Sequence, residues 1–274
     1  MKKLAWLKRT YQTMLIGIIS LMAIIPILLV VVNSVKTAPE SSSMSFDLPS
    51  ALQFENYWTV IHKGKLGQSF TNSMVYSTLS AAFCVLFTSM AAFSLSRNKS
   101  RFNRFLFLFI IMGIALPINY FTLIDIMKWT HLMNTGMGII VLYLVTQIPF
   151  SVFILTGFIG SVPRELDEAG VMDGCGPIRL FFFIIFPMLQ PAAVTVFILS
   201  FLNTWNEFLL PLYYLNSSSK WPMTLAVYQF FGQYQQQWNL VSADIVLTIL
   251  PVIAIYLMGQ RFIIAGMTSG SVKG

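Results

Sequence analysis

The residues most able to do chemistry are acidic and lie close together near the middle of the chain. Four of the ten acidic residues fall within nine positions: Glu165, Asp167, Glu168 and Asp173. Clustered acids can bind a metal ion or act on a phosphate ester when other ligands or a base complete the site. No histidine lies in this segment, and His62 and His131 are distant in sequence. The cluster therefore lacks the partners of an ordinary catalytic centre.

The residues around the acids predict a short helix, a sharp turn and a second helix. The first helix would present one face by i, i+3, i+4, i+7 spacing, made of Leu166, Ala169, Gly170 and Asp173. Pro163 suits the first turn of this helix, and acids that follow it complement the helix dipole. Gly174 and Gly176 stop the helix, and Pro177 can open the next one. Small residues make the face shallow enough for another surface to approach, although a solvated acidic connector fits the pattern equally well.

Other chemical motifs are absent from the sequence. There is no G-x-x-x-x-G-K-[ST] phosphate loop, no H-E-x-x-H and no G-x-S-x-G. The two cysteines, Cys84 and Cys175, predict neither a disulfide framework nor a metal site. We expect no metal and no cofactor in this chain.

The composition indicates which elements must position the acidic cluster. Of the 274 residues, 56% are hydrophobic and only 10% are charged, whereas soluble domains carry roughly 25% charged residues. A chain with so few charges is predicted to be an all-α integral membrane protein in a lipid bilayer. The net charge of +7 would suggest nucleic acid for a soluble protein, but here it indicates topology, and no nucleic-acid partner is expected.

Apolar segments long enough to cross a bilayer as helices predict a bundle of six spans. Residues 1–274 are expected to form a single transmembrane domain, with the acidic connector at 161–186 between spans four and five and a tail at 265–274. The predicted spans are 14–32, 70–95, 105–126, 137–160, 187–211 and 245–264.

The distribution of basic residues predicts the orientation of the bundle. With six spans and an internal N-terminus, only five of the 17 basic residues lie outside, namely Lys36, Lys63, Lys65, Lys128 and Lys220. This imbalance follows the positive-inside rule. Both termini and the acidic connector are therefore expected on the cytoplasmic side of the cell membrane.

The acidic connector resembles the EAA motif of ABC importer permeases. That motif consists of Glu-Ala-Ala, a glycine four positions later and a Leu-Pro pair after a further spacer. Glu168, Ala169, Gly174 and Pro187 match it, whereas Gly170 replaces the second alanine and a phenylalanine replaces the leucine. The segments 91–97, 132–138, 205–208 and 259–274 are also similar to carbohydrate-type members, above all to maltose-type permeases of the G kind.

The resemblance implies partners and roles. Such a permease pairs with a second, different permease subunit, binds two copies of a cytoplasmic ATPase that holds ATP and magnesium, and receives sugar from an extracellular solute-binding protein. The chain itself would be a non-catalytic transport subunit whose connector is a coupling helix, and whose C-terminal tail reaches along the ATPase. The residues to which this implies a coupling role are Glu165, Glu168, Ala169, Gly170, Asp173, Gly174, Pro187, Gly270 and Lys273.

Aromatic and amide side chains inside the spans are candidates for a sugar path, because a sugar has apolar ring faces and many hydroxyls. They are Asn119, Tyr120, Tyr143, Gln147, Asn203, Trp205, Asn206 and Glu207. Each residue taken singly is at least as typical of an interface belt or of bonds between helices. Because Glu207 alone among the acids could lie within the membrane, a proton- or ion-coupled secondary transporter is disfavoured; it stays an alternative, as does a membrane-embedded transferase.

Overall fold

The computed structural model describes residues 2–230 and 237–269, with side chains for residues 10–230 and 237–262. Most of these residues lie in helices, the rest form turns and irregular segments, and no strand occurs among them. The chain divides into two compact units. The first, residues 1–67 and 226–250, contains α1 (Lys2–Ser34), α2 (Ala38–Ser41), α3 (Glu55–Lys63), the short 3-10 helix η3 (Val227–Phe230) and the first part of α14 (Trp238–Ser269).

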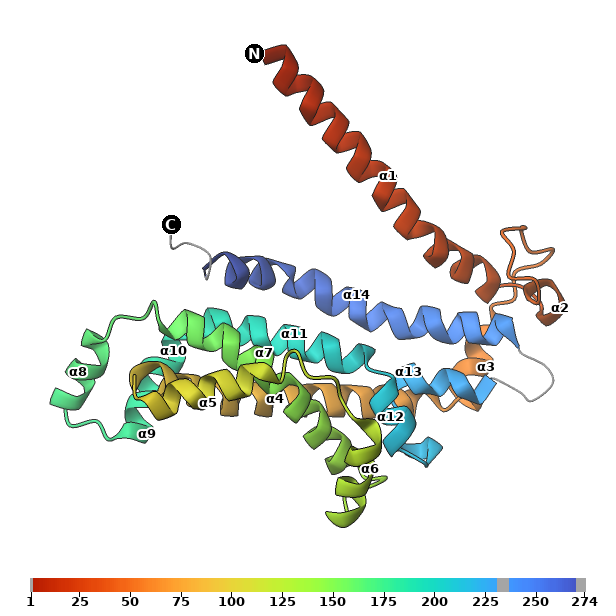
Figure 1. Ribbon diagram of the computed structural model, residues 1–274. Coiled ribbons are helices and arrows are strands. Elements are labelled where there is room, and N and C mark those ends of the chain that lie inside the picture. Colours follow the sequence, from red (N-terminus) through yellow and green to blue (C-terminus); the bar gives the residue numbers. More distant parts are fainter. Residues whose placement is uncertain (1, 231–236, 270–274) are drawn as a thin grey trace. The chain divides into compact units, whose positions relative to one another are not determined.

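The second unit consists of residues 68–225 and 251–274, and its helices are drawn in Figure 1. It holds most of α4 (Leu66–Arg97), then α5 (Arg101–Met112), α6 (Tyr120–Trp129), α7 (Gly136–Ile159), α8 (Glu165–Met172), α9 (Pro177–Leu180), the π-helix η1 (Phe181–Ile185), α10 (Phe186–Met188), α11 (Gln190–Asn206), α12 (Leu209–Tyr214), the 3-10 helix η2 (Ser218–Lys220), most of α13 (Met223–Ala226) and the rest of α14.

Four helices are long and apolar enough to cross a membrane, or five if a bent pair counts as one crossing. The spans predicted at 14–32, 70–95, 137–160 and 245–264 are confirmed as helices in α1, α4, α7 and α14. Long helices satisfy their own backbone hydrogen bonds, which is the condition for crossing lipid. The chain is therefore an all-helical protein with several membrane-spanning segments.

The predicted third span, 105–126, is wrong as a single helix. α5 ends at Met112 and α6 begins at Tyr120, so seven residues between them leave the helical path. Pro117 lies in this break, and a proline both lacks an N–H and disfavours helical backbone in the residue before it. Asn119 starts the next helix, because its side-chain oxygen accepts a bond from the N–H of Thr122 at 3.1 Å.

The predicted fifth span, 187–211, also has different boundaries. The continuous helix is α11, which ends at Asn206, and the chain turns at Glu207 before α12 begins. At its other end α11 meets the segment Pro177–Met188 at a bend of 79°. Pro187 therefore belongs to the arm that precedes the span, and Pro211 to the short helix that follows it.

Buried amides hold the first unit together. The side-chain amide of Asn56 in α3 donates to the carbonyl oxygens of Ser34, the last residue of α1, and of Lys36, both at 2.9 Å. Asn239 near the start of α14 donates to the Asn56 side-chain oxygen at 2.9 Å. A buried amide that lacked such partners would destabilise the fold, so these bonds fix how the three helices meet.

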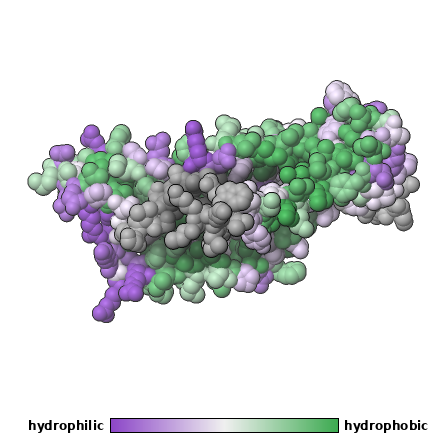
Figure 2. Space-filling view, turned by 90° about the horizontal axis from the view of Figure 1, so that it is seen from above, coloured by the Kyte–Doolittle hydropathy of each residue, from purple (hydrophilic) through white to green (hydrophobic). Residues whose placement is uncertain are grey.

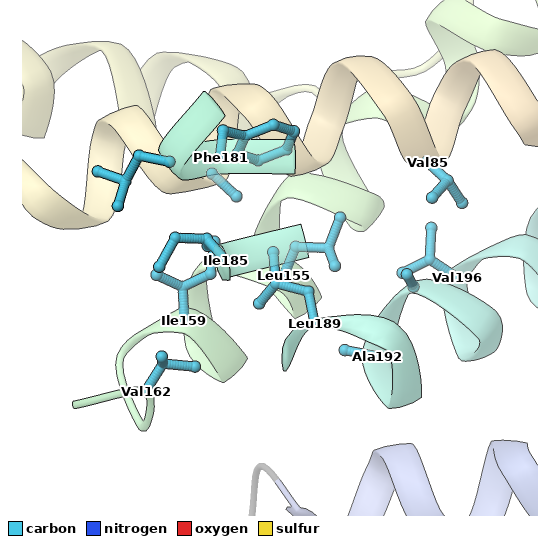
Figure 3. Packing of buried hydrophobic residues seen from close by; sticks show 12 residues of the cluster. Val85, Leu155, Ile159, Val162, Phe181, Ile185, Leu189, Ala192 and Val196 are labelled. Carbon is cyan, nitrogen blue, oxygen red and sulfur yellow. The ribbon is translucent and has the colours of Figure 1, made fainter. Parts of the chain in front are cut away.

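The second unit has an apolar core where α4, α7, η1 and α11 meet. Figure 3 shows Leu155 and Ile159 of α7 facing Phe181, Ile185 and Leu189. Ile159, Ile185 and Leu189 are fully buried. A second cluster around Tyr143, Leu210 and Tyr214 packs α12 against α6 and α7. These clusters support the two regions that carry the candidate functional residues.

Candidate functional site

The acidic connector forms α8, η1 and the short helices between and after them, at one end of the second unit (Figure 1). α8 begins at Glu165, two residues after Pro163, so this proline precedes the helix and does not occupy its first turn as the sequence suggested. The N–H groups of Asp167 and Glu168 donate to the carbonyl oxygen of Arg164 at 2.9 and 3.1 Å. Acids in the first turn complement the partial positive charge of the helix N-terminus.

Gly174 ends α8, as predicted, and the backbone geometry shows how. Its φ is +78°, and its N–H donates to the carbonyl oxygen of Val171 at 3.0 Å. The N–H of Cys175 donates to the carbonyl oxygen of Gly170 at 2.9 Å. These two bonds form a Schellman motif, which requires a left-handed residue at the position of Gly174. A Cβ atom on Gly174 would meet nothing within 4 Å, so conformation and not crowding selects glycine here.

Gly170 has a different role from the one its small size suggested. It is buried, and a Cβ atom there would lie 2.7 Å from the Cδ1 atoms of both Leu180 and Ile184. The surface that approaches this face is therefore the second arm of the same connector. Glycine at 170 lets α8 pack closely on α9 and η1.

The second arm of the connector begins at Pro177, the first residue of α9, as predicted. It continues through the π-helix η1 and α10 before the bend into α11. The side of the arm that faces the core, Leu180, Phe181 and Ile185, is buried. Pro187 is exposed. A π-helix is rare and is found often at functional sites.

The outer surface of the connector is charged and partly apolar. Glu165, Glu168, Ala169 and Asp173 are exposed, and hydrophilic side chains gather at this end of the second unit in Figure 2. Between them lies an apolar group that the sequence analysis did not single out: Val171, Met172 and Ile178 are 60%, 87% and 72% exposed. Large apolar side chains open to water at the tip of a loop are typical of a docking surface.

The predicted role of Gly270 and Lys273 concerns residues outside those that the structure describes.

The candidate path residues divide by burial. Tyr143 and Trp205 are 2% and 1% exposed and belong to the packing of the second unit; Trp205 stacks on Phe201 with ring centroids 5.7 Å apart. A solute could not reach these two side chains in this arrangement. Asn119, Asn203 and Asn206 are exposed, and Tyr120, Gln147 and Glu207 are half-buried.

Part of the polar set forms two separate contacts, one between α11 and α7 and one between α12 and α6. Asn203 of α11 donates to Gln147 of α7 at 3.4 Å. The hydroxyl of Tyr214 donates to the carbonyl oxygen of Tyr120 at 2.8 Å, and the Tyr120 ring lies 5.1 Å from that of Tyr213. The second of these rings was missed because Tyr213 lies beyond the predicted end of span five.

Other polar candidates are engaged by backbone. Glu207 accepts hydrogen bonds from the N–H groups of Leu209 and Leu210 at 2.8 and 3.1 Å, so it caps the first turn of α12. Asn206 donates to the carbonyl oxygen of Leu202 at 2.8 Å. The hydrogen bonds of Asn206 and Glu207 therefore stabilise the break between α11 and α12.

A mostly apolar pocket of about 660 Å³ opens beside the break between α5 and α6. Asn119, Thr122 and Thr146 supply polar atoms to a lining otherwise made by residues such as Pro117 and Pro149. Among the described residues no group of three or more His, Cys, Asp or Glu side chains could hold a metal ion.

Comparisons with known proteins identify the family. Residues 85–269 match the family described as binding-protein-dependent transport system inner membrane component. The multiple sugar-binding transport system permease protein MsmG of Streptococcus mutans is 34% identical over 278 residues, 100% of each chain. The melibiose/raffinose/stachyose import permease protein MelC of Bacillus subtilis is 31% identical over 265 residues, 96% of each chain.

A solved structure has the same fold. One chain of a bacterial ABC transporter that imports the acidic polysaccharide alginate superimposes with a TM-score of 0.80, covers 92% of this chain and 95% of its own length, and is 21% identical. The relatives are named as transport permeases and not as enzymes, which agrees with the absence of catalytic motifs from the sequence. The chain therefore belongs to the family of binding-protein-dependent transport system inner membrane components, the membrane-embedded permease subunits of ABC importers.

Proposed function

We propose that this chain is a permease subunit of an ATP-driven importer of sugars or oligosaccharides. It forms half of the translocation path together with a second, different permease subunit. Two copies of a cytoplasmic ATPase supply the energy, and an extracellular solute-binding protein delivers the sugar. Names of relatives such as the multiple sugar-binding permease MsmG support a sugar as the solute.

The observation that carries the proposal is the construction of the connector. α8 is closed by the Schellman turn at Gly174 and packed through Gly170 on its own second arm. Its outer surface presents acids and the exposed side chains of Met172 and Ile178. A rigid helix with such a surface suits insertion into a cleft of an ATPase, because it can move as one body when the cleft closes.

The sugar path is proposed near Tyr120, Tyr213, Asn203 and Gln147. Aromatic faces can stack on sugar rings, and amides can bind hydroxyls while the partner subunit closes the other side of the path. Glu207 serves as a helix cap in this proposal and not as a proton relay. That assignment removes one of the acidic residues on which a secondary transporter could have depended; Asp244, which is 1% exposed in α14, is another.

The proposal includes six membrane crossings with both termini in the cytoplasm. Four crossings would be α1, α4, α7 and α14, and the fifth would be α11 with the arm before it. The third would be made by α5 and α6 together, with the break at Pro117 inside protein. Broken helices at membrane depth are tolerated where other parts of the protein or a cavity surround the break.

The test is a charge reversal on the connector. Glu168→Lys should leave a membrane-inserted permease that loses its ATPase during purification of the complex. Removing one member of a desolvated interfacial ion pair costs roughly 2–5 kcal/mol, whereas loss of a helix-dipole interaction costs about 0.3–1 kcal/mol. The matched control is Asp125→Lys, the same charge change on exposed Asp125 of α6.

Co-purification of the ATPase and sugar-stimulated ATP hydrolysis are the measurements. A panel containing raffinose and maltotriose, added with the binding protein, identifies the sugar. If Glu168→Lys keeps a full complement of ATPase and normal stimulation, the connector is not a coupling element and the proposal loses its support.

A further inference from the structure

Arg97, the last residue of α4, binds the acidic connector, which is called the coupling loop below, at several points. Nε of Arg97 lies 2.6 Å from Oδ2 of Asp167 in α8, and Nη2 donates to Oδ1 of the same carboxylate at 3.2 Å. The pair therefore combines one charge-assisted hydrogen bond with a close contact between opposite charges. Arg97 and Asp167 form the single ion pair found among the described residues.

The backbone of the connector completes this contact. Nη1 and Nη2 of Arg97 both donate to the carbonyl oxygen of Val162 at 3.1 Å. In the reverse direction, Nη2 of Arg164 reaches the carbonyl oxygen of Arg97 at 3.4 Å. We call these contacts of Arg97, Val162, Arg164 and Asp167 the arginine clasp. Each side of it supplies donors to the other, so the end of α4 and the start of the coupling loop hold one another.

The clasp is sheltered from solvent. The side chains of Arg97 and Asp167 are 15% and 18% exposed, whereas Glu165, Glu168 and Asp173 are exposed. Asp167 is thus the acid of the cluster that turns inward. Partly buried charges are screened less by salt than surface pairs, and removal of one partner would leave the other without compensation.

The same helix is held at its opposite end. Asn72 donates to the carbonyl oxygens of Ser219 and Trp221 at 3.0 and 3.1 Å. Ser73 accepts from the N–H of Met223 at 2.8 Å. A helix of 32 residues is roughly 48 Å long at 1.5 Å per residue, so α4 links the coupling loop to the segment 219–223, which the topology places outside.

We propose that Arg97 is a positioning residue that makes α4 move with the coupling loop when the ATPase closes. The arginine clasp transmits displacement of α8 to α4, and α4 carries it to the segment 219–223. Arg97 itself contacts neither the ATPase nor the solute. This proposal rests on the coupling role proposed above.

The first experiment follows the distance between α8 and α4 without any sugar. Spin labels are placed at exposed Arg179 of α9, the arm on which α8 packs through Gly170, and at Ser94 of α4 in the assembled transporter, after Cys84 and Cys175 are replaced by serine. With the clasp intact, the distance distribution should be the same in the nucleotide-free and the ATP-plus-vanadate-trapped states. With Arg97→Ala it should shift or broaden on trapping, because α8 then moves without α4.

The second experiment measures coupling in proteoliposomes, with raffinose and maltotriose as probes and their binding protein present. Arg97→Ala should still co-purify with the ATPase but transport roughly 3- to 30-fold less sugar per ATP hydrolysed. The double exchange Arg97→Asp with Asp167→Arg should recover part of the ratio. Arg97→Lys should lie between wild type and alanine, because lysine keeps the charge but lacks the rigid guanidinium that bonds Asp167 and the carbonyl oxygen of Val162 together. Arg104→Ala, an exposed arginine on α5, is the matched control and should change nothing.

The outcomes separate this proposal from the coupling assignment itself. If Glu168→Lys removes the ATPase while Arg97→Ala leaves the label distance constant on trapping, the loop is a coupling element and the clasp transmits nothing. If Arg97→Ala fails to insert into the membrane, Arg97→Lys and the double exchange take its place in both experiments. If trapping leaves the distance distribution between the labels unchanged in all of these variants, as in the wild type, the proposal is overturned.

Discussion

Substitution of Gly174 tests whether the end of α8, the proposed coupling helix, depends on backbone conformation. The residue has φ +78° and forms the left-handed step of the Schellman turn. Left-handed backbone costs a residue with a side chain about 1–2 kcal/mol relative to glycine. Because a Cβ atom on Gly174 would meet nothing within 4 Å, Gly174→Ala adds this conformational cost and no steric one.

The cost should appear as weaker binding of the ATPase. If the loop must hold this turn to seat in its partner, 1–2 kcal/mol corresponds to a roughly 5- to 30-fold loss of affinity. Gly174→Asn should lose less, because asparagine tolerates left-handed backbone. The permease should remain inserted and folded, since Gly174 is exposed and an added Cβ atom there meets no neighbour within 4 Å.

The assay is titration of purified ATPase onto the permease pair in nanodiscs. Gly176→Ala is the matched control: Gly176 is two residues away, has φ −70° and also has no atom within 4 Å of an added Cβ. Gly176→Ala should therefore bind like wild type. Equal losses at 174 and 176, or no loss from Gly174→Ala, would refute the conformational reasoning.

Three further predictions concern the cap of α12, the tail and the loop that contains Glu40. Glu207→Gln should keep transport independent of the proton gradient and alter sugar handling at most, because glutamine still offers an acceptor to α12; Glu207→Ala should destabilise the cap by about 0.5–2 kcal/mol, and a transport rate that collapses with an uncoupler at constant ATP would contradict this role. Deletion of residues 268–274 should lower transport and ATPase activity without lowering membrane insertion; unchanged rates would show that the tail is dispensable. Hydrogen bonds from Ser50 and Thr37 lower the pKa of Glu40 from 4.5 to about 2, so this contribution to loop stability is fully present above pH 4.5 and is lost as the pH falls through about 2. The rate at which a protease cleaves this loop should accordingly be the same at pH 7 and pH 5 in the wild type, and should be higher at both pH values in Glu40→Ala. Equal cleavage of the two proteins would argue against the role of Glu40.

Much of the candidate site follows from local sequence, because its determinants are local. The start of the second arm at Pro177 and the end of α8 at Gly174 depend on which backbone conformations proline and glycine adopt. The apolar runs that become α1, α4, α7 and α14 are long because a bilayer requires about 20 apolar residues per crossing. These features are decided within a few residues of the position that shows them.

The remaining features depend on residues that are distant in sequence. From the sequence alone, Gly170 is expected on the outer face of its helix. In the structure it is covered by Leu180 and Ile184, which belong to the second arm of the connector. The breaks after α5 and α11 lie in segments whose apolar composition suits an unbroken span, and composition does not register that Asn119 and Glu207 cap the next helices. Trp205 and Tyr143 have the chemistry of sugar ligands, yet tertiary packing buries them.

The arginine clasp is the clearest case of a feature that depends on residues distant in sequence. Arg97 and Asp167 each have an ordinary local environment for a residue near a helix end, and they are 70 positions apart in the chain. The sequence determined that a charged connector would lie on one side of the membrane, because few charges were available and lipid accepts none cheaply. Which acid turns inward, and which helix it holds, was decided only when α7 brought the connector back to the end of α4, since an ion pair requires two side chains to arrive at the same place.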